Sequence, residues 1–280
     1  MKKILKIYYN FDVTNYENYD GGIIFFYNSS YFYFCKCFFD EEYLFNLRKF
    51  CFKLPNFNFH SLIYNKNGYL KSEDYVLMKL NSFIDDVIFD DIFMFFKYNF
   101  SFFKDKYLSF DKIWEYRIDY LERQLDEISF NNLINNNIDY FIGICETLLI
   151  FYKKNINDNE LNLSLSHNKM NTLSSVEFFN PLNLSVDCNL KDFARYIKLT
   201  KNEQKIVGCL KNLNYSEKCY LFVRLVFPFK FFHEVSEVLL DSKKEDELID
   251  IINNVGEYEE YIYRVEEIFG IFLFSWIKKE

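Results

Sequence analysis

The pattern of apolar residues changes once along this 280-residue chain, at about residue 85, and this change limits the fold more than any other feature. Before it, short runs of β-branched and aromatic residues alternate with turn residues. The runs are Ile4 to Tyr9, Ile23 to Tyr27, Tyr31 to Phe39, His60 to Tyr64 and Tyr75 to Leu80. Such runs, separated by turns such as Asp20-Gly21-Gly22 and Asn28-Ser29-Ser30, predict an antiparallel meander.

One helix is predicted within this strand-rich part. Asp40, Glu41 and Glu42 place carboxylates in its first turn, where the helix dipole favours negative charge. Apolar residues then follow at Leu44, Leu47 and Phe50, so we expect one helix packed on the sheet.

After about residue 85 the apolar residues recur with helical spacing. Trp114, Ile118, Leu121, Leu125 and Ile128 are separated by three or four positions and predict one face of a helix. Further helical faces run through Ile138 to Leu149, from Lys191 onward, and through Val235 to Leu239 and Leu248 to Ile252. A stretch rich in Asn and Ser, from about 155 to 190, reads as a loop. The pattern predicts an α+β protein with a β-rich part at 1–82 and a helical part at 83–280.

Charge, apolar runs and cysteines exclude several classes of partner. The net charge is −8 and Lys and Arg are scattered among Asp and Glu, so we expect no nucleic-acid surface. No apolar run reaches the ~18 residues that a membrane span needs, so we expect no membrane partner. Seven cysteines without a CxxC pair, beside three histidines, favour reduced thiols, no zinc site and a cytoplasmic location.

Several segments in the second two-thirds of the chain resemble one protein family in their order and spacing. They are Ile113 to Glu122, Ile138 to Glu146, Leu165 to Lys169, Phe179 to Asn183, Asp187 to Lys198 and Arg224 to Pro228. They resemble the bacterial spore-coat-associated kinase-like family, a divergent branch of the aminoglycoside/choline phosphotransferases. The resemblance implies a protein-kinase-like fold with two lobes, in which a small antiparallel sheet with one helix precedes a larger helical lobe.

The resemblance implies that the catalytic loop is degenerate. Active phosphotransferases of this fold carry a His-Gly-Asp loop, whose Asp orients or deprotonates the attacking hydroxyl. This chain has His167-Asn168-Lys169 at that place, so that Lys169, which is cationic at neutral pH, stands at the position of the base. His167 is expected to be a packed structural histidine rather than a catalytic one.

The resemblance also assigns the metal ligand and a structural aspartate. The metal position falls on Asn180, which offers a neutral oxygen instead of a carboxylate and should bind Mg²⁺ weakly, although Asn180 before Pro181 is also an ordinary turn residue. Asp187 is an alternative carboxylate that would rescue metal binding. Asp192 corresponds to the aspartate that opens the next helix and is expected to be its N-cap.

The phosphate-binding residues of the small lobe have weaker counterparts. Lys36 would be the strand lysine that contacts the phosphates, with Glu41 or Glu42 as its partner, although a solvent-facing strand lysine is the simpler interpretation. Gly21-Gly22 is the candidate for a glycine-rich phosphate loop.

These substitutions lead to three hypotheses about function. The first is a pseudokinase, a binding or scaffold protein with weak or lost binding of ATP and Mg²⁺, whose partner is an unknown protein and, by resemblance, a spore-coat protein. Loss of a general base alone costs ~10²–10⁴ in rate. The second is an active, unconventional ATP-Mg²⁺ phosphotransferase that uses Asp187. The third is an unrelated α+β interaction protein.

Overall fold

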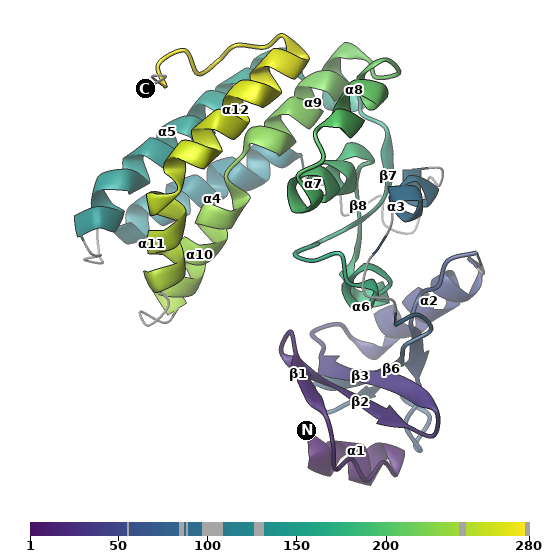
Figure 1. Ribbon diagram of the computed structural model, residues 1–280. Helices are drawn as coiled ribbons and strands as arrows, with labels where there is room; N and C mark the ends of the chain where they lie inside the picture. Colours follow the sequence, from purple (N-terminus) through teal and green to yellow (C-terminus); the bar gives the residue numbers. More distant parts are fainter. Residues whose placement is uncertain are drawn as a thin grey trace. The chain divides into compact units, whose positions relative to one another are not determined.

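The computed structural model describes residues 1–54, 56–83, 87, 89–96, 109–125, 132–240 and 245–277. The chain divides into two compact units (Figure 1). The first unit contains Met1–Met94 and His167–Ser185, and the second contains Phe95–Ser166 and Val186–Glu280. The predicted boundary after residue 82 stays a prediction, because residues 84–86 beside it lie outside the described residues. By its contacts, however, the segment His167–Ser185 belongs with the β-rich part.

The first unit is built on an antiparallel sheet. Its strands run in the order β1-β2-β3-β6-β4, and β5 also pairs with β6. The bounds are β1 Glu17–Tyr19, β2 Gly22–Tyr27, β3 Ser30–Lys36, β4 Ser61–Ile63, β5 Lys71–Ser72 and β6 Tyr75–Lys79. Strands predicted at 23–27, 31–39, 60–64 and 75–80 are therefore confirmed, with small differences at their ends.

A helix, α1 (Lys2–Tyr9), replaces the strand predicted at Ile4 to Tyr9. Ile4 and its neighbour Leu5 are both buried, together with Tyr9. Adjacent residues of a strand point to opposite faces of the sheet, whereas a helix can bury both on one side. These side chains pack on one face of the sheet, against Ile23, Phe25, Phe32, Phe34 and Leu77.

The predicted helix after the first three strands is confirmed as α2 (Glu41–Phe52). Asp40 is its N-cap, and the Asp40 side chain accepts a hydrogen bond from the Tyr43 backbone N–H at 2.7 Å. Leu44 and Leu47 are fully buried, as the helical spacing predicts.

The second unit is mainly helical. Its helices are α4 Phe110–Leu125, α5 Asn132–Asn155, α7 Leu190–Thr200, α8 Gln204–Leu210, α9 Tyr215–Val226, α10 Phe229–Leu240, α11 Glu245–Asn253 and α12 Val255–Phe269, with a short turn η2 Asp158–Glu160. A further helix, α3 (Phe89–Phe96), crosses the division between the units. Helix α9 is buried along most of its length and packs against α5, α7 and α12. The predicted helical faces are confirmed, except that Ile128 and the side chain of Leu125 lie outside what the structure describes.

The stretch from 155 to 190 contains regular structure, where the composition predicts a loop. Strands β7 (Leu163–His167) and β8 (Leu184–Cys188) pair with each other, and between them lie α6 (Ser175–Phe178) and η3 (Pro181–Asn183). Leu184, Val186 and Cys188 are buried in alternation, which is the burial pattern of a strand. The prediction failed because serines take up buried positions in β7 that are apolar in most strands, such as Ser164 and Ser166.

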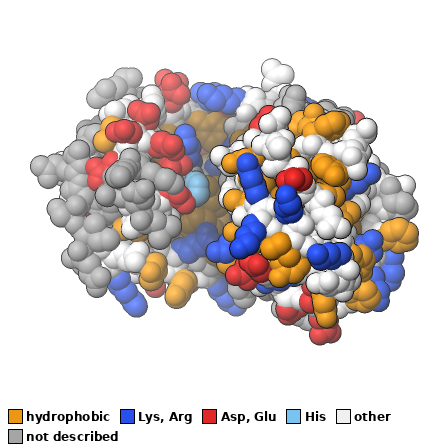
Figure 2. All heavy atoms as spheres, turned by 90° about the horizontal axis from the view of Figure 1, so that it is seen from below, with side chains coloured by type: hydrophobic (Ala, Val, Ile, Leu, Met, Phe, Trp, Pro, Cys, Tyr) orange, Lys and Arg blue, Asp and Glu red, His pale blue; other side chains and the backbone are white. Residues whose placement is uncertain are grey.

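The surface around α1 has mixed character. Lys2, Lys3 and Lys6 are exposed on this helix beside the exposed Ile7. Figure 2 views the molecule from the side of α1, and basic and hydrophobic side chains are interspersed there. None of the helices among the described residues has both the length and the apolar character needed to cross a bilayer.

Candidate functional site

His167 is the last residue of β7 and has none of its surface exposed. Its Nε2 donates to the carbonyl oxygen of Phe178 at 2.7 Å, and its ring lies 4.5 Å from the Phe178 ring. These contacts fix the imidazole against α6, and they suit the packed structural role that the sequence predicts for this residue.

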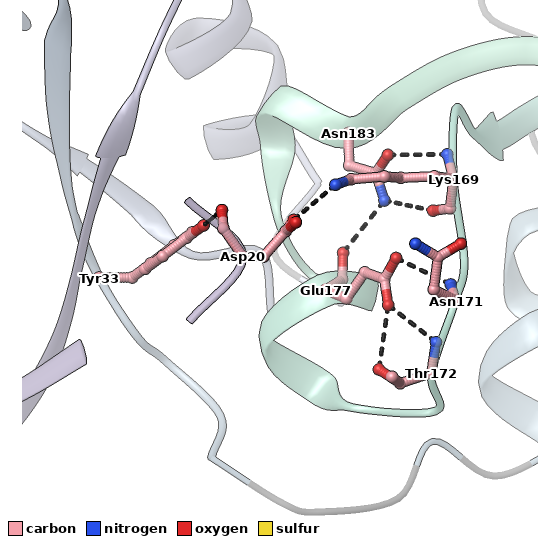
Figure 3. A network of polar contacts seen from close by, with 7 residues as sticks. All are labelled: Asp20, Tyr33, Lys169, Asn171, Thr172, Glu177 and Asn183. Atoms are coloured by element: carbon pink, nitrogen blue, oxygen red, sulfur yellow. Dashed lines mark hydrogen bonds and ion pairs between the residues drawn. The ribbon is translucent and has the colours of Figure 1, made fainter. Parts of the chain in front are cut away.

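The segment after His167 is held by the side chain of Asn183 (Figure 3). Its Oδ1 accepts from the Lys169 backbone N–H at 3.0 Å, and its Nδ2 donates to the Lys169 carbonyl at 2.6 Å. The backbone of Asn168 also donates to the Asn183 carbonyl at 2.7 Å. Asn183 therefore fixes the backbone of Asn168 and Lys169, the residues that the resemblance aligns with the catalytic loop.

Glu177, in α6, also binds the segment that follows His167. This buried carboxylate accepts hydrogen bonds from the backbone N–H groups of Asn171 and Thr172, both at 2.9 Å, and from the Thr172 hydroxyl at 3.0 Å. Glu177 was not predicted as a site residue, and Asn183 was noted only as part of a segment that resembles the family. The only signal for either residue was a carboxylate or amide in an Asn-rich segment, which is too common to single out a site.

The Lys169 side chain leaves this segment and forms an ion pair with Asp20. Its Nζ lies 2.5 Å from Asp20 Oδ2, and the two side chains are 48% and 52% exposed. Asp20 belongs to the turn between β1 and β2, and its carbonyl accepts from the Tyr33 hydroxyl at 3.1 Å. Lys169 is thus connected to the first hairpin of the sheet (Figure 3).

Local geometry explains why glycine is found at positions 21 and 22. Asp20 and Gly21 are the two turn residues, and both have positive φ (38° and 72°), as a tight two-residue hairpin requires. At Gly22 a Cβ would lie 2.5 Å from the Phe34 carbonyl oxygen and 2.7 Å from the Tyr33 ring. Close contact with β3 and turn geometry therefore account for Gly21-Gly22 without a phosphate.

Lys36 ends β3 and is exposed. In the register it lies opposite Tyr75, and it shares a face of the sheet with Phe32 and Phe34, the face that α1 covers. Its Nζ lies 5.5 Å from the centre of the Phe38 ring, and in the described part of the chain it forms no ion pair. Its predicted phosphate contact stays a prediction, which this placement does not favour.

The expected acidic partners of Lys36 are placed differently. The Glu41 carboxylate accepts from the backbone N–H groups of Leu70 at 2.6 Å and Lys71 at 3.0 Å, and Glu42 is exposed. Glu41 therefore fixes the connection before β5, a role that the sequence did not predict.

Asn180 serves as the N-cap of η3, where its Oδ1 accepts from the Leu182 backbone N–H at 3.0 Å. Asn180 is therefore placed as an ordinary turn residue, which is the alternative to the predicted metal ligand. Among the described residues, no group of three or more His, Cys, Asp or Glu side chains is arranged to hold a metal ion.

Asp187, in β8, has both carboxylate oxygens engaged. Oδ1 accepts from the Cys188 backbone N–H at 2.8 Å and from the Tyr220 hydroxyl at 3.0 Å, and Oδ2 lies 3.0 Å from the Lys191 ammonium. Burial lowers the pKa of Lys191, and the Asp187 charge opposes that shift. Burial, followed by the nearby Asp187, raises the pKa of Tyr220 well above its ordinary value.

Asp192 is not the N-cap of α7, so that prediction is wrong. The helix begins at Leu190, Asn189 precedes it without a side-chain capping bond, and Asp192 is the third helical residue. The buried Asp192 carboxylate instead accepts from the Ser166 hydroxyl at 3.0 Å. The error arose because the helix begins at Leu190, three residues earlier than an N-cap at Asp192 would place its start.

Comparison with known proteins identifies the fold. No family model matches the sequence, and no curated protein matches it. The structure is similar to the crystal structure of an aminoglycoside phosphotransferase from Alicyclobacillus acidocaldarius, with a TM-score of 0.63 over 93% of each chain and 9% sequence identity. The chain therefore has the predicted α+β, protein-kinase-like fold of the aminoglycoside phosphotransferases. At this identity the likeness is one of fold and does not identify an activity.

Proposed function

We propose that this chain is a pseudokinase, a protein of the aminoglycoside phosphotransferase fold that binds a partner without transferring phosphoryl groups. The observation that carries the proposal is the ion pair between Lys169, at the position of the catalytic base, and Asp20, in the turn between β1 and β2.

The chemistry of phosphoryl transfer explains why this pair matters. In kinases of this fold, the first hairpin covers the nucleotide phosphates and a catalytic-loop Asp accepts the proton of the attacking hydroxyl. Here the loop presents an ammonium, which has no lone pair to accept a proton, and the hairpin presents a carboxylate, which repels phosphates. An exposed ion pair is worth only about 0–1 kcal/mol, so its strength is not the obstacle. The obstacle is the absence of a base together with a negative charge in the turn.

The residues available for ATP and Mg²⁺ fit these cofactors poorly. Asn180 uses its side-chain oxygen to cap η3. In Asp187, Oδ1 already accepts a hydrogen bond and Oδ2 forms an ion pair with Lys191. Weak or absent binding of nucleotide and metal therefore belongs to the proposal. The partner would be a protein, and the resemblance noted above suggests a spore-coat protein.

The alternative, an unconventional phosphotransferase that uses Asp187, has less support. Asp187 would have to release Lys191 and Tyr220 before it could hold a metal. If it did so, Asp187→Asn would abolish a magnesium-dependent activity.

A turnover assay tests the proposal. We expect the full chain with Mg²⁺ and γ-labelled ATP to release no phosphate above the buffer rate, and Lys169→Ala to behave as the wild type does. Active kinases turn over at about 1–100 per second, so even a rate 10⁴-fold lower is measurable over hours. A magnesium-dependent rate that one substitution removes would contradict the proposal.

A further inference from the structure

Arg224, on α9 in the second unit, is buried without a polar partner. Only 4% of its surface is exposed, and its Nε is fully enclosed with no acceptor. Within the described ranges it takes part in no hydrogen bond or ion pair, and its guanidinium lies against aromatic rings. Its guanidinium carbon lies 4.7 Å from the centre of the Phe229 ring, 5.1 Å from that of Phe110 and 5.9 Å from that of Tyr220.

The rings satisfy only part of what a guanidinium requires. The face of an aromatic ring attracts a cation, by about 0.5–2 kcal/mol. It does not replace the hydrogen bonds of the five N–H donors, which lie in the plane of the guanidinium. A buried charge without acceptors is strongly unfavourable, so native proteins retain one where it has a use.

Asp187, which is linked to Arg224 through Tyr220, does not supply the missing acceptor. Its oxygens are already taken by Lys191, Tyr220 and the Cys188 backbone, so its charge neutralises Lys191 rather than Arg224. Tyr220 therefore has Arg224 over its ring while its hydroxyl is directed to Asp187.

A second basic side chain, Lys198, lies at this place. The Nζ of Lys198, on α7, lies 4.9 Å from the centre of the same Phe229 ring and donates to the Phe227 carbonyl at 2.7 Å. No carboxylate lies within ion-pair distance of it among the described residues. Burial, and then the positive charge of Arg224, lower the pKa of Lys198 well below its ordinary value. Lys198 and Phe229 are both partly exposed, so this place is not completely closed off from solvent.

We propose that Arg224, with Lys198 beside it on the Phe229 ring, forms a binding site for an anionic group, either the phosphate or the carboxylate of a ligand. A guanidinium offers two parallel N–H donors that match the oxygens of either group. The three rings hold the guanidinium in place and exclude water from its faces, which strengthens such bonds. This site lies wholly within the second unit and does not depend on the proposed loss of phosphoryl transfer.

Thermal unfolding of the full chain in sodium phosphate and in sodium succinate, at constant ionic strength, tests this site. We expect a saturable rise of the midpoint, by roughly 5 °C at saturation, with at least one of the two anions. A response to phosphate alone would identify a phosphate-type ligand, and a response to succinate would identify a carboxylate.

Three variants separate this site from nonspecific anion effects. Arg224→Met should lose the response and, without anion, melt no lower than the wild type, because a buried unpaired charge is removed. Arg224→Lys keeps the charge without the planar donors, so it should bind at least ~10-fold more weakly. Arg123→Met, at an exposed position on α4, should respond as the wild type does. The proposal would be overturned by a wild type that responds to neither anion, or by Arg224 variants that keep the full response.

Discussion

At the scale of single residues, His60 shows how burial sets a protonation state. Its Nε2 donates to the Ser175 carbonyl at 3.2 Å, and its Nδ1 accepts from the Asn81 backbone N–H at 3.4 Å. These two bonds require the neutral ring, because a protonated Nδ1 has no lone pair for Asn81. Burial lowers the pKa of His60 to about 4.

The low pKa of His60 predicts a loss of stability in mild acid. The unfolded chain binds this proton near pH 6.5 and the folded chain only near pH 4, so stability is complete above pH 6.5 and is lost as the pH falls toward 4. We expect about 2 kcal/mol of the loss in unfolding free energy between pH 7 and pH 5 to come from this residue. Urea unfolding at the two pH values should show that His60→Gln removes this part.

The exposed His233 supplies the matched control. His233→Gln should keep the pH dependence of the wild type, including the contribution of the carboxylates. If His60→Gln and His233→Gln show equal pH dependence, the buried ring of His60 is not the cause.

At the scale of secondary-structure elements, the hairpin of β1 and β2 depends on two glycines for different reasons. Gly21 has positive φ, whereas Gly22 lies against the backbone of β3. A methyl group at Gly22 would meet the Phe34 carbonyl oxygen at 2.5 Å, and a hydrogen-bonded strand has little freedom to move away.

Gly22→Ala should therefore destabilise the first unit, by about 1–3 kcal/mol in unfolding free energy. Gly256→Ala, in α12, is the matched control, because a Cβ there meets nothing within 4 Å. Alanine favours a helix over glycine by up to about 1 kcal/mol, so this control should be neutral or stabilising. Equal effects of the two substitutions in chemical denaturation would show that contact with β3 does not require Gly22.

The elements that sequence reasoning predicted correctly are those with a strong local pattern. Turn residues between aromatic runs located β2 and β3, and helical spacing located α4 and α5. The prediction failed at α1, where a short apolar run fits either a helix or a strand, and packing on the sheet decides between them. It failed at β7 because serines occupy buried positions of that strand, and the hydroxyl of one of them, Ser166, bonds Asp192 in another element.

For the candidate site, the sequence suggested positions, which stay predictions, but it gave no information on contacts. The resemblance placed Lys169 at the position of the base, and His167 is packed as expected. The partner of Lys169 is Asp20, 149 residues away in the sequence, and a pairing of that range leaves no local signal. Arg224 went unnoticed because the sequence shows neither its burial nor its lack of an acceptor.

At the scale of the whole molecule, this chain and the phosphotransferase it resembles share a fold, although 9% of their aligned residues are identical. A similarity of 0.63 in TM-score at 9% identity is consistent with conservation of the packing pattern rather than of particular residues. A fold of this kind can retain its two parts while the residues that bind nucleotide are replaced, so nucleotide binding has to be measured on this chain itself.

Thermal unfolding of the full chain with ATP, in the presence and absence of Mg²⁺, tests the central claim most directly. A ligand at 100 times its dissociation constant stabilises a protein by about 2.7 kcal/mol, which shifts the midpoint by several degrees. We expect no magnesium-dependent shift at millimolar ATP, because the proposed function assigns Lys169 to the place of the base and Asp20 to the turn that would bind phosphate. A clear shift that requires Mg²⁺ would contradict the claim and would show that a working nucleotide site survives.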